Sequence, residues 1–379
     1  MRRWLLLLGL ILTALLTLTG CSGGARQESW PGLIVVDDVV VAADVNQLRG
    51  LDAATGKLLW AWPETTKSNA AIGFYATPAY DADRGLLLAA GFKDRTVYAF
   101  RVDGSLREPP TLAWTFPADK EGGAKGQYVA GGTIAGDLFL IGNGDGTLYA
   151  LRLDDGSLAW SFHTDDRIWN APLVRDDTVY LTSLDHHLYA LALDDGSPKW
   201  QVETAGAVAM APVYADGSLW IGDFGYRIYR IDPQSGEVTW TFTEGKDWFW
   251  ATPVAHEGMI YFTDVSGNVW AFATATNELR WHTAVNGAIF RGRGLLTPDG
   301  AKLFEPDYVH GLVYLFDTRN GQQIAWGTPP ANPGRLPGDL ASDDERLYTM
   351  PILIPQHVQT FDLERGELIW EYPVPEEAK

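Results

Sequence analysis

The chain has 379 residues, of which 46% are hydrophobic, and it contains 40 glycines, 16 tryptophans and 15 tyrosines. This composition excludes a disordered chain, because so many apolar and aromatic side chains can bury enough surface to order the backbone, and it favours short strands joined by tight turns. The formal net charge of −19 disfavours nucleic acid and anionic lipid headgroups as partners, since both would be repelled at long range.

Residues 1–20 differ from the rest of the chain. Arg2 and Arg3 precede an apolar run that is too short for an ordinary membrane span and is typical of an export signal. The run ends in LTGC at positions 18–21, which resembles the lipobox of bacterial lipoproteins, where the cysteine is lipidated and becomes the new N-terminus. Because Cys21 is the only cysteine, a disulfide framework and a CxxC site are both excluded. We therefore predict a lipoprotein signal peptide over residues 1–20 and lipidation at Cys21.

Residues 21–32, CSGGARQESWPG, have the composition of a flexible tether. Ten such residues span roughly 17 Å as a random coil. The lipid would therefore hold the domain that follows, predicted over residues 33–375, close to a membrane surface.

Within residues 33–375 a tryptophan recurs every 40 to 54 residues. The eight copies end at Trp60, Trp114, Trp160, Trp200, Trp240, Trp281, Trp326 and Trp370. This period fits a four-stranded propeller blade, and the clearest copy, residues 171–203, contains four apolar runs separated by three turns. We predict an all-β fold, an eight-bladed β-propeller of four-stranded antiparallel blades, with seven blades as the alternative.

A turn precedes each tryptophan, and in several copies it contains Asp followed by Gly. The aspartate caps backbone N–H groups and the glycine accepts a positive φ. Glycine stands four residues before the tryptophan at Gly56, Gly156, Gly196, Gly236 and Gly366. Asn277 takes this place before Trp281, and asparagine is the non-glycine residue that best tolerates the left-handed conformation. The seventh copy departs from the pattern, with five residues from Gly321 to Trp326.

The tryptophans are predicted to dock neighbouring blades together. Alternation such as Leu158, Trp160 and Phe162 places large apolar groups on one face of the last strand of a blade. A single blade cannot bury both faces of its sheet, so each tryptophan should fill the seam with the next blade. The first copy begins with its own inner strand and the last ends with its own outer strand, so the sequence leaves open how the ring closes.

The segments YALRLDDGSLAW at 149–160 and YALALDDGSPKW at 189–200 resemble the tryptophan-docking repeat of quinoprotein-type (PQQ-like) β-propellers. The resemblance covers nearly all of residues 33–375. It implies eight blades, and the family includes lipid-anchored members similar to the BamB-like subunit of the β-barrel assembly machinery of Gram-negative outer membranes.

The same resemblance raises the question of catalysis, because the enzymes of the family are PQQ-dependent alcohol dehydrogenases that stack the quinone on a vicinal disulfide. One cysteine cannot form that disulfide, and the histidines lack metal-ligand spacing. The NGDGT stretch at 143–147 lacks the ligand series of a calcium loop and falls where a hairpin turn is due. We therefore expect no enzyme, no catalytic residue, no metal and no cofactor. The alternative is a propeller that binds PQQ or another small ligand, as a sensor or a dehydrogenase-like protein.

Strand alternation places the outer-to-inner connections and the second-to-third turns on one rim of the ring, and the candidate partner-binding residues lie there. The aromatic and arginine residues in these loops are Tyr75, Trp169, Phe224, Tyr226, Arg227, Trp248, Phe249, Trp250, Phe290 and Arg291. Aromatic and arginine side chains are the usual anchors of protein interfaces. In the WFW stretch at 248–250, neighbouring side chains point to opposite sides, so at least one should be open to solvent or to the channel. The alternative for each residue is packing into the channel wall.

Taken together, these features predict a lipid-anchored, extracytoplasmic and monomeric propeller that binds a protein or peptide partner. The resemblance implies a task in the cell envelope, in outer-membrane protein assembly. In a Gram-negative cell the protein would sit on the periplasmic face of the outer membrane. In a cell with a single membrane it would sit on the outer face of that membrane, as an extracellular sensor or ligand-binding domain.

Overall fold

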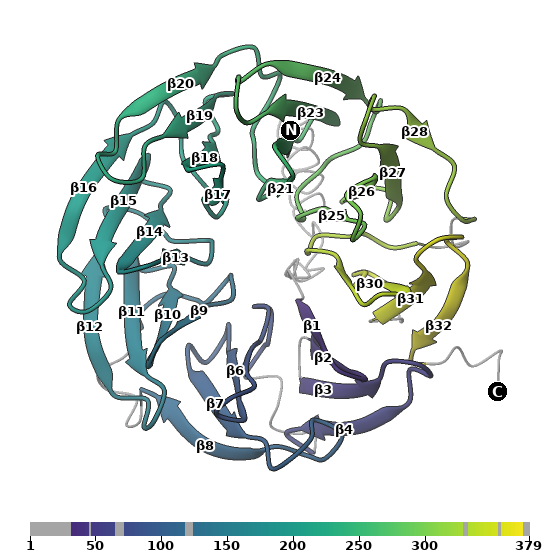
Figure 1. The fold of residues 1–379 in the computed structure, drawn as a ribbon. Coiled ribbons are helices and arrows are strands. Elements are labelled where there is room, and N and C mark those ends of the chain that lie inside the picture. The colour runs from purple at the N-terminus through teal and green to yellow at the C-terminus, as the bar shows by residue number, and fades with distance from the viewer. Residues whose placement is uncertain are drawn as a thin grey trace, which may run out of the picture.

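The computed structural model describes residues 32–44, 47–64, 72–117, 124–328, 333–354 and 358–373. The predicted signal peptide and Cys21 lie outside these residues. Within them the chain forms strands that are grouped radially around a centre, and the chain passes once around the ring from the N-terminal to the C-terminal end (Figure 1).

Each sheet contains four antiparallel strands that are consecutive in the sequence and are paired in sequence order. The structure therefore confirms the predicted eight-bladed β-propeller, and the seven-bladed alternative is wrong. In each blade the first strand lies toward the centre and the fourth on the circumference, as β17 and β20 show in Figure 1.

The strands of the first four blades have the following bounds. Blade 1 contains β1 (Leu33–Val36), β2 (Val39–Asp44), β3 (Gln47–Asp52) and β4 (Leu58–Trp62). Blade 2 contains β5 (Ala79–Asp81), β6 (Leu86–Ala90), β7 (Val97–Arg101) and β8 (Thr111–Phe116). Blade 3 contains β9 (Thr133–Ala135), β10 (Leu138–Gly142), β11 (Thr147–Arg152) and β12 (Leu158–His163). Blade 4 contains β13 (Leu173–Arg175), β14 (Thr178–Thr182), β15 (His187–Ala192) and β16 (Pro198–Glu203).

The other four blades follow the same plan. Blade 5 contains β17 (Val213–Ala215), β18 (Ser218–Gly222), β19 (Ile228–Ile231) and β20 (Val238–Phe242). Blade 6 contains β21 (Val254–His256), β22 (Met259–Thr263), β23 (Asn268–Ala273) and β24 (Leu279–Ala284). Blade 7 contains β25 (Leu295–Leu296), β26 (Lys302–Pro306), β27 (Val313–Asp317) and β28 (Gln323–Ile324). Blade 8 contains β29 (Ala341–Ser342), β30 (Arg346–Thr349), β31 (Val358–Asp362) and β32 (Leu368–Tyr372).

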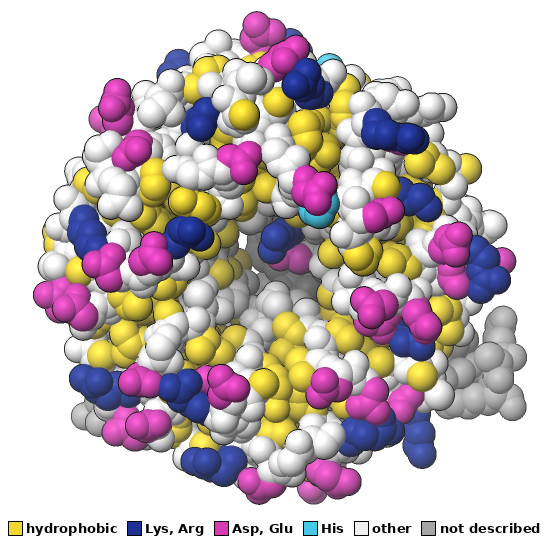
Figure 2. Space-filling view, viewed as in Figure 1, with side chains coloured by type: hydrophobic (Ala, Val, Ile, Leu, Met, Phe, Trp, Pro, Cys, Tyr) yellow, Lys and Arg dark blue, Asp and Glu magenta, His cyan; other side chains and the backbone are white. Residues whose placement is uncertain are grey.

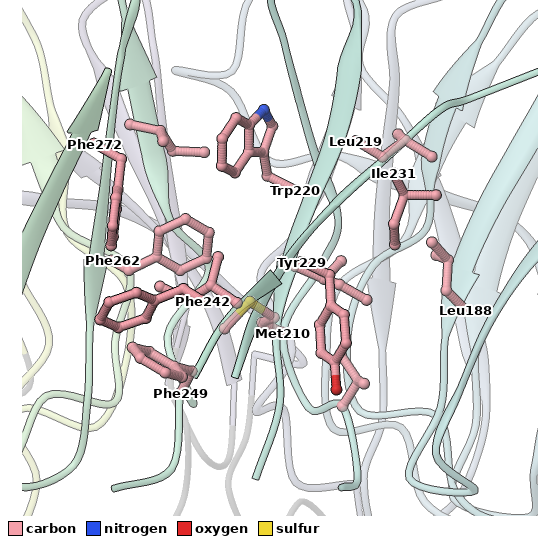
Figure 3. Packing of buried hydrophobic residues seen from close by; sticks show 14 of the residues in the cluster. Leu188, Met210, Leu219, Trp220, Tyr229, Ile231, Phe242, Phe249, Phe262 and Phe272 are labelled. Atoms are coloured by element: carbon pink, nitrogen blue, oxygen red, sulfur yellow. The ribbon is translucent and has the colours of Figure 1, made fainter. Parts of the chain in front are cut away.

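The core lies in the seams between blades. Second strands such as β14 and β18 are buried at every residue, because both of their faces pack on neighbouring blades. One hydrophobic cluster contains Tyr180 from blade 4, Trp220 from blade 5 and Phe262 from blade 6. Figure 3 shows phenylalanines of this cluster gathered near Met210, and Phe242 meets Phe272 edge to face, as Phe249 does Phe262. Each blade is thus stabilised by its neighbours on both sides.

The eight signature tryptophans lie in these seams, and none of them is exposed. Seven donate their indole N–H to a backbone carbonyl in the following blade. Trp160, for example, donates to Leu193 at 2.9 Å, close to the left-handed glycine of the next turn. The donor and acceptor pairs are Trp60 and Leu106, Trp114 and Leu153, Trp160 and Leu193, Trp200 and Pro233, Trp281 and Thr318, Trp326 and Leu363, and Trp370 and Ala53.

Trp240 is the eighth tryptophan, and it lies against the turn in which Asn277 replaces glycine. Asn277 has the predicted positive φ of 61°. Trp240 packs edge-on against Phe272, with ring centroids 5.5 Å apart, and the described residues hold no carbonyl partner for its indole. The turn without glycine is therefore also the turn on which the tryptophan fails to dock by a hydrogen bond.

The ring closes by the same docking contact that joins the other blades. The indole of Trp370 in blade 8 donates to the carbonyl of Ala53 in blade 1 at 2.9 Å. Residues of blades 1 and 8 share one core cluster, in which Leu51 and Tyr348 are fully buried. Among the described residues no blade combines strands from the two ends of the chain, so closure rests on side-chain packing.

Candidate partner-binding surface

Hydrogen bonds join the outer-to-inner connections and the second-to-third turns on one rim. The amide of Phe249, in the connection from blade 5 to blade 6, donates to the carbonyl of Asp223 in a turn of blade 5 at 3.2 Å. The amide of Val265, in a turn of blade 6, donates to the carbonyl of Trp248 at 3.0 Å. The two kinds of loop therefore meet on the rim where the sequence places the candidate anchors.

Four aromatic rings form a stack along this rim. Phe224 stacks on Trp248 with centroids 4.9 Å apart and on Trp250 with centroids 5.1 Å apart. Trp250 in turn lies 6.1 Å from Trp169, whose ring has the guanidinium of Arg167 above it at 6.0 Å. Trp248 is 40% exposed, which confirms that one ring of the WFW stretch is open. The prediction of an open ring rested on the alternation of side chains along a strand. Residues 248–250 belong to a loop, and their side chains alternate there as well.

Two further arginines continue this stack toward blade 8. The guanidinium of Arg291 lies 4.9 Å from the ring of Trp250 and 4.4 Å from the ring of Tyr308. The guanidinium of Arg335 lies 5.3 Å from the centroid of the Tyr308 ring and donates a hydrogen bond to the Tyr308 hydroxyl at 3.2 Å. Cation–π contacts hold these long side chains in place.

We call this set the aromatic–arginine belt. It consists of Arg167, Trp169, Phe224, Trp248, Trp250, Arg291, Tyr308 and Arg335. Tyr308 is buried, with 6% of its surface exposed, and it belongs to the belt as the ring on which Arg291 and Arg335 lie. Its members come from loops that lie between β12 of blade 3 and β29 of blade 8 in the chain.

Beside the belt, the centre of the ring is hollowed, as Figure 2 shows. The cavity has a volume of about 300 Å³, and Trp169, Trp250 and Arg291 of the belt form part of its wall. The Nε atom of Arg291 and the Oδ1 atom of Asn170 are buried in this wall without a hydrogen-bond partner among the described residues. The wall thus contains one unpartnered donor and one unpartnered acceptor.

Tyr226 and Arg227 lie near the belt, in the turn between β18 and β19 that also carries Phe224. Both side chains are exposed, and Tyr226 is 44% exposed with a φ of 64°. They remain candidate contacts at the edge of the belt.

Three of the predicted anchors are buried in blade seams and do not belong to this surface. Phe249 and Phe290 have no exposed area, and Phe249 packs edge-on against Phe262 with centroids 6.0 Å apart. Tyr75 is 4% exposed and packs against Phe92, and burial raises the pKa of its hydroxyl. Phe249 follows the exposed Trp248, and alternation along this loop points its ring into the core.

Sequence reasoning missed Arg167, Tyr308 and Arg335. Arg167 stands two residues before the predicted anchor Trp169, so the alternation along that loop could have found it. Tyr308 occupies the second-to-third turn of blade 7, the position that Phe224 holds in blade 5. No sequence signal connects Arg335 to Tyr308, because they belong to different blades.

Two features of the PQQ-dependent enzymes, a metal site and a vicinal disulfide, can be compared with this chain. Among the described residues no three His, Cys, Asp or Glu side chains are placed to hold a metal ion. Asp145 of the NGDGT turn is engaged structurally, because it accepts bonds from the amide of Thr147 at 2.9 Å and the hydroxyl of Tyr149 at 3.0 Å. A vicinal disulfide would need two cysteines, and the chain has one.

In the described part of the chain there is no helix of the length and hydrophobicity needed to cross a membrane.

Solved structures similar to this chain share its fold. BamB from Moraxella catarrhalis superposes with a TM-score of 0.66 at 17% identity, over 84% of this chain and 92% of that chain. The computationally designed Ika8 protein superposes with a TM-score of 0.68 at 12% identity, over 86% of this chain and 94% of that chain. At these identities the likeness shows the fold alone.

Among curated proteins, the chain is similar to the dehydrogenase subunit of a quinone alcohol dehydrogenase. The subunit from Acetobacter aceti is 31% identical over 38% of this chain and 21% of its own length. That from Gluconacetobacter polyoxogenes is 29% identical over 41% of this chain and 22% of its own length. The chain thus spans about a fifth of the length of these relatives.

The family model described as outer membrane protein assembly factor BamB matches residues 108–223 and 225–379. These two segments make up more than half of the chain and include blades 3 to 8. The chain therefore belongs to the family of the outer membrane protein assembly factor BamB.

Proposed function

We propose that this protein is a non-catalytic scaffold that binds a protein partner through the aromatic–arginine belt, in the assembly of outer-membrane proteins. The observation that carries the proposal is the belt itself, a row of aromatic rings and arginines presented by one rim. Family membership supports the envelope task.

The belt has the chemistry of an interface centre. Aromatic and arginine side chains carry most of the binding energy in protein complexes. The arginines are held on rings before any partner arrives, so binding costs less side-chain entropy than it would for free arginines. In a chain with a net charge of −19, these cations also favour a partner that presents carboxylates beside apolar groups.

The anchor is part of the same proposal. Lipid on Cys21 and the tether over residues 21–32 would hold the propeller at the periplasmic face of the outer membrane, as a monomer. The LTGC stretch at 18–21 supports this placement.

Site-specific photo-crosslinking in cells tests the belt. A photoreactive amino acid at Trp248 should crosslink to an envelope protein that takes part in outer-membrane protein assembly. The matched control is Leu112, an exposed apolar residue on the outer strand β8, at which we expect no such product.

Substitutions give the second test. Trp250→Ala and Arg291→Ala should each lower the yield of the Trp248 crosslink by about tenfold, as loss of a central anchor does. Arg319→Ala, in an exposed turn before β28, should leave it unchanged. Equal yields from all four proteins would refute the role of the belt.

A second candidate function is the binding of a small ligand in the central cavity. The partial identity with quinone alcohol dehydrogenase subunits and the unpartnered Arg291 Nε and Asn170 Oδ1 atoms favour it. The missing disulfide argues against the quinone-binding mode of those enzymes. An absorption spectrum and a metal analysis of the purified protein decide the matter, because a bound quinone or metal would give a signal that a pure scaffold lacks.

A further inference from the structure

Blade 7 has an unusually short outer strand. β28 contains two residues, whereas the outer strands of the other blades contain five or six. The cause is the additional residue between Gly321 and Trp326. Trp326 still docks on blade 8, where its indole N–H donates to the backbone carbonyl of Leu363 at 3.1 Å. The amide of Gly327 donates to the backbone carbonyl of Arg365, also at 3.1 Å. The chain therefore leaves blade 7 early and is held by blade 8.

As a result, part of the third strand of blade 7 has an open edge. β27 pairs with β26 along its whole length but with β28 only at Leu315 and Phe316. The amide of Asp317 points away from β26, toward the outer edge of the blade, because it donates to the backbone carbonyl of Gln322 at 2.9 Å. Alternate residues of a strand direct their N–H and C=O groups to the same side, so Val313 also points outward. In the described chain no outer strand pairs with Val313.

A groove follows this open edge. It has a volume of about 220 Å³ and lies between β27, the departing segment after β28, and the face of blade 8. Its apolar wall includes Leu312, Ile324 and Phe361. We call it the blade 7 groove.

The blade 8 side of the groove carries a polar group without a partner. Leu347 packs against blade 7, and Thr349 lies on the same face of β30 two residues later. Thr349 lines the groove and is 1% exposed, and its hydroxyl has no hydrogen-bond partner among the described residues. Buried hydroxyls are normally bonded, so this one points to a missing ligand.

We propose that the blade 7 groove binds an extended peptide segment of another protein, which adds to β27 as an outer strand. The outward N–H and C=O of Val313 would pair with its backbone, and its alternate apolar side chains would enter the groove. The stretch of β27 without an outer partner, residues 313–314, is about 7 Å long at about 3.3 Å per residue, which suits pairing with two or three residues of the segment. The native outer strand cannot take this place, because Trp326 and Gly327 are bound to blade 8.

A synthetic peptide of alternating threonine and valine, acetylated and amidated at its ends, is the probe. Its binding is measured by isothermal titration calorimetry, and its site by hydrogen exchange. We expect slower exchange at the amide of Val313. The same peptide with N-methyl groups on alternate amides keeps its side chains but loses the donors, and it should bind at least about tenfold more weakly.

Two variants locate the binding. Deletion of Ala325 restores the spacing of four residues between glycine and tryptophan, so β28 should extend over Val313 and weaken peptide binding by about tenfold or more. Val313→Pro removes the outward donor and is tolerated at an edge, whereas Val313→Ala keeps the donor. Weaker binding by the proline variant than by the alanine variant supports the proposal, even if the deletion variant fails to fold.

Three outcomes would overturn the proposal. These are no binding of the peptide at millimolar concentration, undiminished binding by a folded Ala325 deletion, and protection of amides on another blade only. The groove and the belt are separate surfaces, so none of these results bears on the proposed function.

Discussion

At the scale of single residues, the glycine in six of the docking turns meets two demands at once. Gly196 has a φ of 72°, which an L-amino acid adopts only with strain. A Cβ atom there would also lie 2.4 Å from Cε3 of the Trp160 ring. The positive φ was predicted from the turn sequence, but the second demand depends on the preceding blade. Asn277 still meets the first demand, with a φ of 61°, but Trp240 does not dock by its indole N–H.

Gly196→Ala and Gly217→Ala separate the two demands. Gly217 has a φ of 76° and open space where a Cβ would stand, so its substitution adds only backbone strain of about 1–2 kcal/mol. Gly196→Ala should cost about 1–3 kcal/mol more, because the methyl group collides with an indole. Chemical denaturation measures both free energies of unfolding. Equal losses would show that the indole moves aside freely.

At the scale of the blade, several turns between the second and third strands are held by a tyrosine. The hydroxyl of Tyr149 donates to Asp145 at 3.0 Å, and that of Tyr229 donates to Asp223 at 2.8 Å. Burial raises the pKa of Tyr149 to about 12, with the charge of Asp145 adding to the effect. Burial likewise raises the pKa of Tyr229 to about 12, although its bond from the Ala205 amide opposes the shift. These bonds place the turns that carry the rim loops.

These two tyrosines predict a loss of stability in alkali. Their pKa values are near 10 in the unfolded chain and about 12 in the folded one, so between these values the unfolded state loses its protons first. Their contribution is therefore complete below pH 10 and falls as the pH rises through 12. Denaturation at a series of pH values measures this slope, which should flatten in Tyr149→Phe. The exposed Tyr226 provides the control, as Tyr226→Phe. A slope in Tyr149→Phe as steep as that of the unsubstituted protein would contradict the assignment.

At the scale of the whole molecule, the ring depends on one seam that no peptide bond bridges. The other seven seams join blades that are consecutive in the chain, whereas blades 1 and 8 are joined by Trp370 and the cluster around Tyr348. Opening this seam would leave every blade intact but expose the two end sheets.

Trp370→Ala should therefore open the ring locally. A large-to-small change in the core costs about 3–5 kcal/mol, and here the cost falls on the seam between the chain ends. Hydrogen exchange should speed up in β1 and β31, while β14 and β18 in the opposite half stay protected. Trp160→Ala is the matched control, and we expect its faster exchange to be confined to blades 3 and 4. Uniform acceleration in both variants would mean that the propeller unfolds as one unit.

The sequence by itself determined the blade and the turn conformations, and it predicted eight blades with seven as the alternative. The alternation of apolar side chains, an Asp-Gly turn and a docking tryptophan each depend on a few neighbouring residues, and their repetition along the chain makes the blade recognisable. Only the tertiary structure decided that Trp248 is exposed while Phe249 and Phe290 are buried, and that Arg335 reaches Tyr308. It also decided that Trp370 closes the ring on Ala53. The physical reason is that these outcomes depend on which side chains from other blades occupy the neighbouring space, and those blades lie tens to hundreds of residues away in the chain.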